Sequence, residues 1–168
     1  MGKKLFWIVV LIFSGCKGIS QKNQNQMEET KNKEEVVYEV TKTDAEWRAE
    51  LTEDEYYVLR KAATERPFTS ELLENKDKGT YVCAGCATPL FRSENKYRSG
   101  TGWPSFDLEI EGNVAYDVDY DIGYKRTEEH CATCGGHLGH VFDDGPRRTT
   151  GKRHCINGIA LDFIPDSK

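Results

Sequence analysis

The chain has 168 residues, with 28 acidic against 23 basic side chains and a formal net charge of −5. This length suits one domain, and the acidic balance argues against a general nucleic-acid-binding protein, which normally carries an excess of basic residues. A local basic cluster at Arg147, Arg148, Lys152 and Arg153 is the exception to that balance.

Residues 1–15 have the features of a bacterial lipoprotein signal peptide. Two lysines precede an apolar run from Leu5 to Phe13, which is far shorter than the roughly 20 residues that cross a bilayer. Small residues then precede Cys16, as in a lipobox, although Phe13 stands where leucine is usual. We therefore expect an exported protein that is anchored to a bacterial membrane by a lipid on Cys16. An ordinary secretory signal and an N-terminal anchor are the alternatives.

The segment that follows Cys16 predicts a tether rather than a domain. Residues 17–40 are polar and charged and show no hydrophobic period, so they cannot bury a core. We expect residues 16–42 to form a flexible tether and residues 43–166 to form one folded domain.

Strands dominate the elements expected in that domain, after a helical start. Thr52 followed by Glu55 forms a capping box and predicts a short helix over residues 51–63. Residues 114–124 alternate strictly, with apolar and tyrosine side chains on one face and three aspartates on the other, which predicts a half-buried strand. Residues 140–142 and 153–163 also predict strands. The domain is therefore expected to be mainly antiparallel β with one or two helices before the strands.

The six cysteines fall into three kinds of context. Two C-x-x-C pairs, each with small residues between the cysteines, have the spacing of a tetrahedral zinc site: Cys83, Cys86, Cys131 and Cys134. Two disulfides or a redox C-x-x-C are the alternatives, but a redox pair of the thioredoxin type would occur in a βαβ pattern that the chain lacks. We expect a structural Zn²⁺ that joins distant segments of the chain.

One cysteine remains once the zinc ligands and Cys16 are assigned, and that is Cys155. In a strand, Arg153, Cys155 and Asn157 share one face, with Ile159 and Leu161 continuing that face inward. A guanidinium near the sulfur favours the nucleophilic thiolate. The alternative is a buried filler cysteine beside a surface ion pair of Arg153.

Two further stretches supply side chains suited to a reaction centre. HLGHVFDDGP carries His137 and His140, and histidine is the usual proton donor near neutral pH. SGTGWPSF displays Trp103 in a loop constrained by glycine and proline, a setting that can hold a small apolar group such as a methyl. Trp103 as an ordinary core residue is the alternative.

Taken together, SGTGWPSF, HLGHVFDDGP, TGKRHCIN and the paired C-x-x-C motifs closely resemble the B-type methionine sulfoxide reductases, which reduce the R epimer. The resemblance covers about residues 43 to 166. It implies a zinc-containing domain of two small antiparallel sheets, which reduces methionine sulfoxide in oxidised proteins or as the free amino acid.

The resemblance also implies a role for each candidate side chain. Cys155 would attack the sulfoxide sulfur and become a sulfenic acid, and Trp103 would pack on the substrate methyl group. The polar groups around them would hold or protonate the sulfoxide oxygen and tune the cysteine: His137, His140, Asp144, Arg153 and Asn157. Many relatives carry a second, resolving cysteine where this chain has Thr101, so a thioredoxin-fold protein or another external thiol is expected to reduce the sulfenic acid.

Two competing functions remain open at this point. A zinc-clasp module that binds a protein partner would explain the C-x-x-C pairs, but not the joint presence of GWPSF and HLGH. A one-cysteine peroxidase would explain Cys155, but it would have no use for a methyl pocket at Trp103.

Overall fold

The computed structural model describes residues 37–167. The predictions for the signal peptide, for Cys16 and for most of the tether therefore lie outside the described residues. Within 37–167, no helix combines the length and apolar character needed to cross a membrane. Contacts of the folded unit begin just before the expected boundary, since the Val40 amide donates to the Thr133 carbonyl at 2.9 Å.

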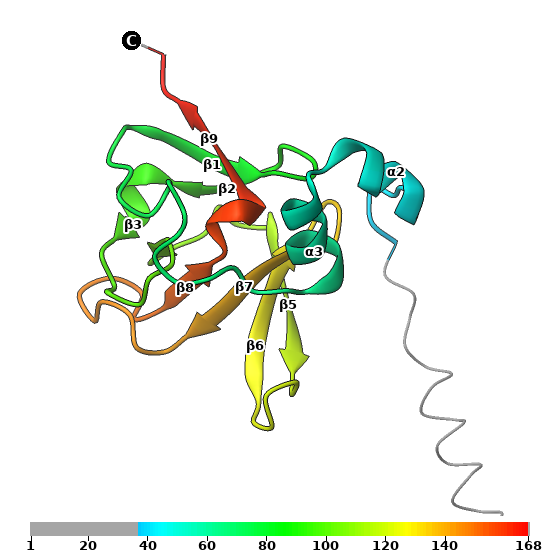
Figure 1. Cartoon of the computed structure of the whole chain (residues 1–168). Coiled ribbons are helices and arrows are strands. Elements are labelled where there is room, and N and C mark those ends of the chain that lie inside the picture. The colour runs from blue at the N-terminus through cyan, green and yellow to red at the C-terminus, as the bar shows by residue number, and fades with distance from the viewer. Residues whose placement is uncertain (1–36, 168) are drawn as a thin grey trace, which may run out of the picture. The chain divides into compact units, whose positions relative to one another are not determined.

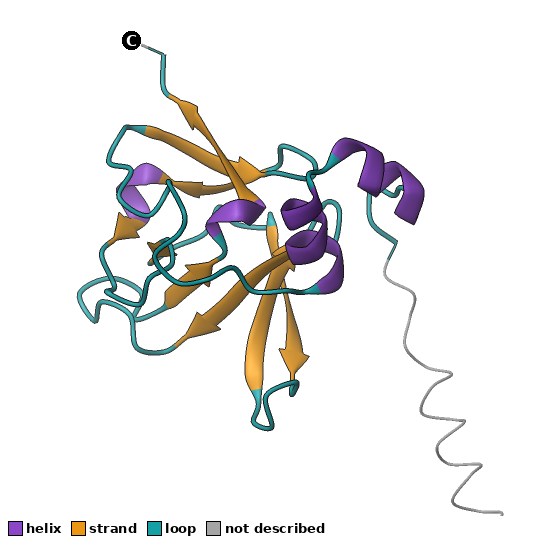
Figure 2. Ribbon diagram, in the orientation of Figure 1, coloured by secondary structure: helices purple, strands orange, loops and turns teal. Residues whose placement is uncertain are grey.

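Two antiparallel sheets form the body of the domain (Figures 1 and 2), as predicted. The smaller sheet has three strands in the order β2 (Pro89–Arg92), β1 (Gly79–Cys83) and β9 (Leu161–Pro165). The larger sheet has six, in the order β3 (Lys96–Tyr97), β4 (Ser105–Phe106), β8 (Arg153–Ile156), β7 (His137–Phe142), β6 (Arg126–Cys131) and β5 (Val114–Asp119). Two 3-10 turns, η1 (Ser93–Asn95) and η2 (Gly158–Ala160), complete this part.

Aromatic side chains from both sheets build the core. Phe91 of β2 stacks on Phe106 of β4 with ring centroids 4.4 Å apart, and Tyr81 of β1 meets the same Phe106 edge-on at 4.9 Å. Leu138 and Ile156 of the larger sheet are fully buried in the same cluster. Burial of this apolar surface holds the two sheets together.

Two short helices precede the strands. The predicted helix is confirmed as α3 (Glu53–Lys61), which starts at the Thr52 capping box and ends at Ala62 in the left-handed conformation. Before it lies α2 (Asp44–Glu50), which begins with a second capping box from Thr43 and Glu46. Each box satisfies amide groups that a helix start leaves without partners.

The predicted strand over 153–163 is wrong, because the chain there forms two strands in different sheets. β8 ends at Ile156, the turn η2 redirects the chain, and β9 begins at Leu161. Ile159 and Leu161 therefore do not continue the Cys155 face. A turn is required because β8 pairs with β4 and β7, whereas β9 pairs with β1.

The predicted burial of the 114–124 strand is also wrong. Val114 is buried, but Tyr116 and Val118 are 46% and 48% exposed, whereas Asp119 is only 9% exposed. β5 is an edge strand, and the β5–β6 hairpin extends beyond the rest of the sheet (Figure 1). Asp119 pairs with Arg126 of β6 and His140 of β7, so alternation by itself did not show which side chains of this strand are buried.

Candidate active site

The paired cysteines come together as the spacing predicted. The four sulfur atoms of Cys83, Cys86, Cys131 and Cys134 lie within 4.8 Å of one another, with Cys83 to Cys134 at 3.7 Å and Cys86 to Cys131 at 3.6 Å. Zinc–sulfur bonds of about 2.3 Å in a tetrahedron place neighbouring sulfurs about 3.8 Å apart. The four thiols are therefore arranged as a metal site of this kind requires, and we call them the cysteine clasp.

The clasp joins the two sheets. Cys83 ends β1 of the smaller sheet and Cys131 ends β6 of the larger one, and a tight turn follows each. In the second turn Gly135 has φ +69°, and a Cβ there would lie 2.5 Å from the Tyr38 ring, so glycine is required. The Arg60 guanidinium of α3 donates to the Cys134 carbonyl at 2.9 Å, which ties the helix to the clasp.

Cys155 lies in the middle of the larger sheet, on the opposite face of β8 from the core. His154 and Ile156 are buried, whereas Arg153 and Cys155 point outward. His140 of β7 is the cross-strand partner of Cys155, and directly opposed residues share a face with Cβ atoms about 4.5–5.5 Å apart. The backbones approach closely here, since a Cβ on Gly139 would lie 2.1 Å from the Cys155 carbonyl oxygen.

A small cavity opens beside this thiol. Its volume is about 120 Å³, and it brings together three of the predicted residues around Cys155, namely Trp103, His140 and Asn157. Four residues that the sequence did not single out complete its wall: Thr64, Arg126, Gly139 and Phe142. The cavity therefore combines one thiol, an indole, an imidazole and a guanidinium in a space suited to a small polar group with an apolar end.

The pKa of the Cys155 thiol is set by opposing influences. Burial raises the pKa of Cys155 above its ordinary value, while the bond with Thr101 and the charge of Arg153 act in the opposite direction. The Thr101 hydroxyl oxygen lies 3.8 Å from the sulfur. The net shift is upward, so the predicted activation by Arg153 offsets the burial only in part.

His140 is held by an acidic side chain that the sequence analysis placed in solvent. Its Nε2 donates to Asp119 Oδ2 at 2.7 Å, and Asp119 also pairs with Arg126. The amide of Asp121 donates to the same carboxylate and, with these contacts, lowers the pKa of Asp119 to about 2. Burial lowers the pKa of His140, and the bond to Asp119 counteracts that shift.

His137 lies next to His140 but does not line the cavity. The two imidazole rings are 5.6 Å apart, centroid to centroid. Nδ1 of His137 bonds with Glu128 Oε1 at 2.6 Å, and its buried Nε2 makes no hydrogen bond among the described residues. A direct role of His137 at the sulfoxide oxygen therefore stays a prediction.

The amide of Asn157 is fixed by two backbone groups. Its Oδ1 accepts from the Glu65 amide at 3.0 Å and its Nδ2 donates to the Leu138 carbonyl at 3.0 Å. The Trp103 indole in turn donates to the Glu65 carbonyl at 3.2 Å. The Glu65 backbone thus connects two cavity residues, Asn157 and Trp103. A direct bond from Asn157 to a sulfoxide oxygen stays a prediction.

Arg153 and Asp144 form a bidentate ion pair at 2.7 and 2.9 Å. The guanidinium also lies over the Phe142 ring, 4.3 Å from its centroid. Neither residue lines the cavity. The charge of Arg153 acts on the pKa of Cys155, and Asp144 holds that guanidinium in place.

The site residues that the sequence analysis missed share one property, which is that only tertiary contacts bring them to the cavity. Arg126 and Thr64 lie in stretches without any motif, and Asp119 was assigned to the solvent face of its strand. The hydrophilic alternation of residues 117–121 was the one available signal. A row of three aspartates on one face of a strand also fits a polar network beneath a catalytic surface.

Comparisons with known proteins find one family over most of the chain. A family model described as the SelR domain matches residues 51–165. A peptide methionine sulfoxide reductase MsrB of Leptospira interrogans is 54% identical over 127 residues, covering 75% of this chain and 96% of that protein. The same-named proteins of Leifsonia xyli and Methanosarcina barkeri are 51% and 50% identical, over 78% and 74% of this chain and 95% and 87% of their own lengths.

Proposed function

Because this chain belongs to the SelR-domain family of peptide methionine sulfoxide reductases, we propose that it reduces the R epimer of methionine sulfoxide through a sulfenic acid on Cys155. The observation that carries this proposal is the cavity, in which the only cysteine outside the clasp among the described residues faces Trp103 and His140. The resemblance of the cavity motifs to B-type enzymes supports the choice of epimer.

In the first step, the Cys155 thiolate attacks the sulfoxide sulfur. The oxygen leaves the substrate for the cysteine sulfur, so methionine sulfoxide is reduced to methionine while Cys155 is oxidised to the sulfenic acid. A proton is needed on the oxygen, and His140 is the acid placed to supply it, with Asp119 keeping its ring in place. Trp103 packs on the methyl group and so orients the sulfur toward the thiolate.

In the second step, an external thiol condenses with the sulfenic acid, which releases water and forms a mixed disulfide. A second thiol then regenerates the Cys155 thiol and leaves as a disulfide. Small dithiols and thioredoxin-fold donors have this chemistry. The four clasp cysteines are unsuited to the task, because each lies among the other three.

The clasp is proposed to hold a structural Zn²⁺. The close, largely buried sulfurs of the four cysteines fit that ion, and four thiolates leave no open position for chemistry. Bound zinc contributes folding free energy by fixing β1 to β6.

A stereochemical assay tests this function. Purified protein with dithiothreitol should reduce the R sulfoxide and leave the S sulfoxide unchanged. With substrate but no reductant, it should release one methionine per chain and give a dimedone adduct on Cys155. Reduction of hydroperoxides in preference to either sulfoxide would favour the peroxidase alternative instead.

Thr101 offers a second test of the recycling step. Thr101→Cys places a thiol where the hydroxyl now lies 3.8 Å from the Cys155 sulfur, close enough for a disulfide after a small side-chain rotation. Substrate without reductant should then yield an internal disulfide in place of the dimedone adduct, with zinc retained. Thr101→Ser is the matched control and should keep the adduct.

The location of the protein is proposed from its N-terminal sequence. The apolar run that precedes Cys16 supports a lipid anchor. Because the contacts of the fold begin near Val40, a spacer of about 20 residues would span roughly 22–27 Å. Mass spectrometry of the mature protein should find its first residue to be an acylated Cys16. Recovery of a chain that still begins at Met1 would reject the anchor.

A further inference from the structure

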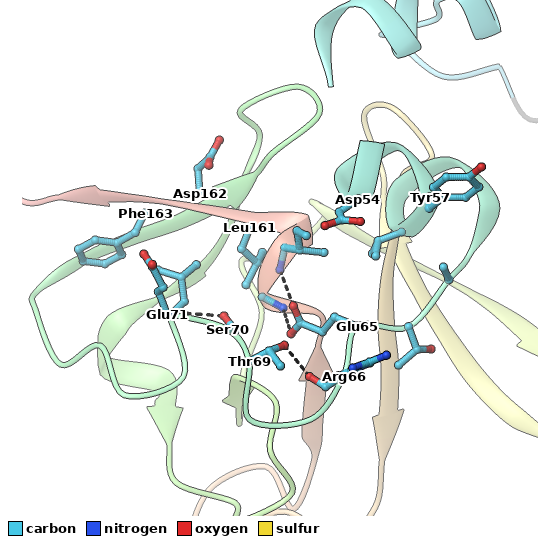
Figure 3. A pocket seen from close by; sticks show the side chains of 16 residues that line it. Asp54, Tyr57, Glu65, Arg66, Thr69, Ser70, Glu71, Leu161, Asp162 and Phe163 are labelled. Carbon is cyan, nitrogen blue, oxygen red and sulfur yellow. Dashed lines mark hydrogen bonds between the residues drawn. The ribbon is translucent and has the colours of Figure 1, made fainter. Parts of the chain in front are cut away.

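A second and larger hollow adjoins the Cys155 cavity. Its volume is about 730 Å³, which falls within the roughly 300–1,000 Å³ of typical ligand sites. Figure 3 shows that α3, β9 with the turn η2, and the segment 63–72 surround it. We call this hollow the flanking groove.

The flanking groove and the Cys155 cavity share one wall. Thr64 lines both spaces. Next to it, the Glu65 carboxylate accepts from the amides of Gly158 and Ile159 at 2.6 and 3.0 Å, as the dashed lines of Figure 3 show. The Glu65 backbone meanwhile bonds with Trp103 and Asn157 of the cavity. A polypeptide whose methionine side chain enters the cavity therefore has the groove directly beside it for its neighbouring residues.

The charged side chains that line the flanking groove are mostly acidic. Asp54 of α3, Glu71 of the 63–72 segment and Asp162 of β9 are exposed, and none of the three carboxylates makes a hydrogen bond or ion pair within residues 37–167. Arg66 is the only basic side chain among the lining residues. The Glu65 carboxylate is already occupied by backbone amides. The groove thus presents three available carboxylates to a ligand.

Apolar surface lies between these carboxylates. Tyr57 is 45% exposed, and Leu72 and Phe163 are partly exposed along the same groove. A basic side chain matches this mixture, because its methylene stem packs on apolar surface while its charged end reaches a carboxylate. Free methionine sulfoxide is too small to use both the cavity and the groove.

From the shared Thr64 wall and the charge of the groove we propose that the flanking groove binds the substrate polypeptide beside the oxidised methionine and favours chains that carry Lys or Arg near it. The proposal rests on the function proposed above and adds a substrate class to it. The occupant is a protein or peptide with a basic residue within a few positions of the sulfoxide.

Peptide competition at the level of kcat/KM tests the proposal. The probes are peptides with one R-sulfoxide and with Lys, Ala or Glu placed in turn at each of the four positions on either side. Dithiothreitol serves as reductant throughout, so that docking of a protein reductant does not contribute. N-acetylmethionine sulfoxide, which cannot reach the groove, reports the chemistry at Cys155 alone.

Three variants complete the design. Asp54→Asn combined with Asp162→Asn removes two groove carboxylates, Asp162→Lys reverses one charge, and Glu53→Gln removes a neighbouring exposed carboxylate of α3 that does not line the groove. Wild type should prefer a Lys peptide at one or more positions. The double variant should lower kcat/KM for that peptide by roughly fivefold. Asp162→Lys should shift the preference toward the Glu peptide.

The control results separate the two proposals. Glu53→Gln and all groove variants should turn over N-acetylmethionine sulfoxide at the wild-type rate. Equal kcat/KM for Lys, Ala and Glu peptides in wild type, or a Lys preference that is undiminished in the double variant, overturns the groove proposal. Turnover of the short substrate in that case leaves the proposed function intact. Failure to reduce any sulfoxide overturns both.

Discussion

In the cysteine clasp every sulfur lies within 4.8 Å of the other three, whereas the Cys155 sulfur lines a small cavity with the Thr101 hydroxyl 3.8 Å away. The clasp sits where the ends of β1 and β6 meet, and Cys155 sits in the middle of β8. The same side chain therefore serves two purposes in one domain. The four clasp sulfurs are spaced to share a metal ion and so to stabilise the fold, while the Cys155 sulfur has no such partners and is the one we propose to react.

The strongest test of this division is to remove the reactive sulfur. Cys155→Ser should reduce turnover of the R sulfoxide to below about a thousandth of wild type, because the nucleophile is lost. Its free energy of unfolding should change by less than about 1 kcal/mol, since the hydroxyl fits the same half-buried position. Turnover and chemical denaturation measure the two effects. Residual activity near wild type would mean that another group attacks the sulfoxide.

Removal of a clasp sulfur should have the opposite pattern. Cys131→Ser should abolish tight zinc binding and remove a large share of the ~5–15 kcal/mol that stabilises a domain. Any fraction that stays folded should still form the sulfenic acid on Cys155. Metal analysis and thermal unfolding check this, with Cys155→Ser as the control that keeps one zinc per chain. Unchanged stability after complete metal removal would contradict a structural role.

A smaller effect is expected from removing the carboxylate that holds His140, the proposed proton donor. Asp119→Asn removes the carboxylate that holds Nε2 of His140 and opposes the downward shift of its pKa. The pKa of His140 should therefore fall further, and kcat should drop by roughly tenfold to a hundredfold.

The pH profile gives this prediction a definite sign. A proton donor acts in its protonated form, so a lower pKa of His140 moves the alkaline decline of kcat to lower pH. Nuclear magnetic resonance titration of His140 reports the pKa directly. Asp121→Asn is the matched control, because its contact with Asp119 is made by the backbone amide. An unchanged titration in Asp119→Asn would contradict the role of that carboxylate.

The smallest effect concerns the tuning of the thiol. Arg153 lowers the pKa of Cys155 against the stronger influence of burial, so Arg153→Gln should raise that pKa further. The thiolate fraction at neutral pH then falls, and kcat/KM should decrease several-fold there and recover at alkaline pH. The pH dependence of alkylation by iodoacetamide measures the shift. Arg148→Gln, in the same basic cluster but exposed, should leave the alkylation curve in place.

Local sequence patterns predicted the features that depend on neighbours in the chain. The capping box of Thr52 and Glu55 gave α3, because its partners are three residues apart. Each C-x-x-C pair likewise specifies its own tight turn. The joining of the two turns in one clasp was predicted because a tetrahedral zinc site needs four thiolates, two from each pair.

Predictions that depend on how a strand packs against the rest of the sheet were wrong. The alternation of residues 114–124 gave the right element but misjudged which side chains are buried, because β5 lies at an edge and its Asp119 pairs with Arg126 and His140. The strand over 153–163 was predicted too long. Asn157-Gly158 is a turn dipeptide inside that stretch, and the chain changes sheets at η2 directly after it.

The sequence by itself determined the chemistry of this protein: one cysteine left over from a four-thiol site, with tryptophan and histidine motifs that resemble a known reductase family. Only the tertiary structure decided what surrounds that cysteine. Thr64 and Arg126 line the cavity, and Asp119 bonds with His140 of its wall, although all three lie far from Cys155 in the sequence. Residue types are fixed locally, but which of them share a cavity depends on strand order and on which face each strand buries, and these are properties of the whole sheet.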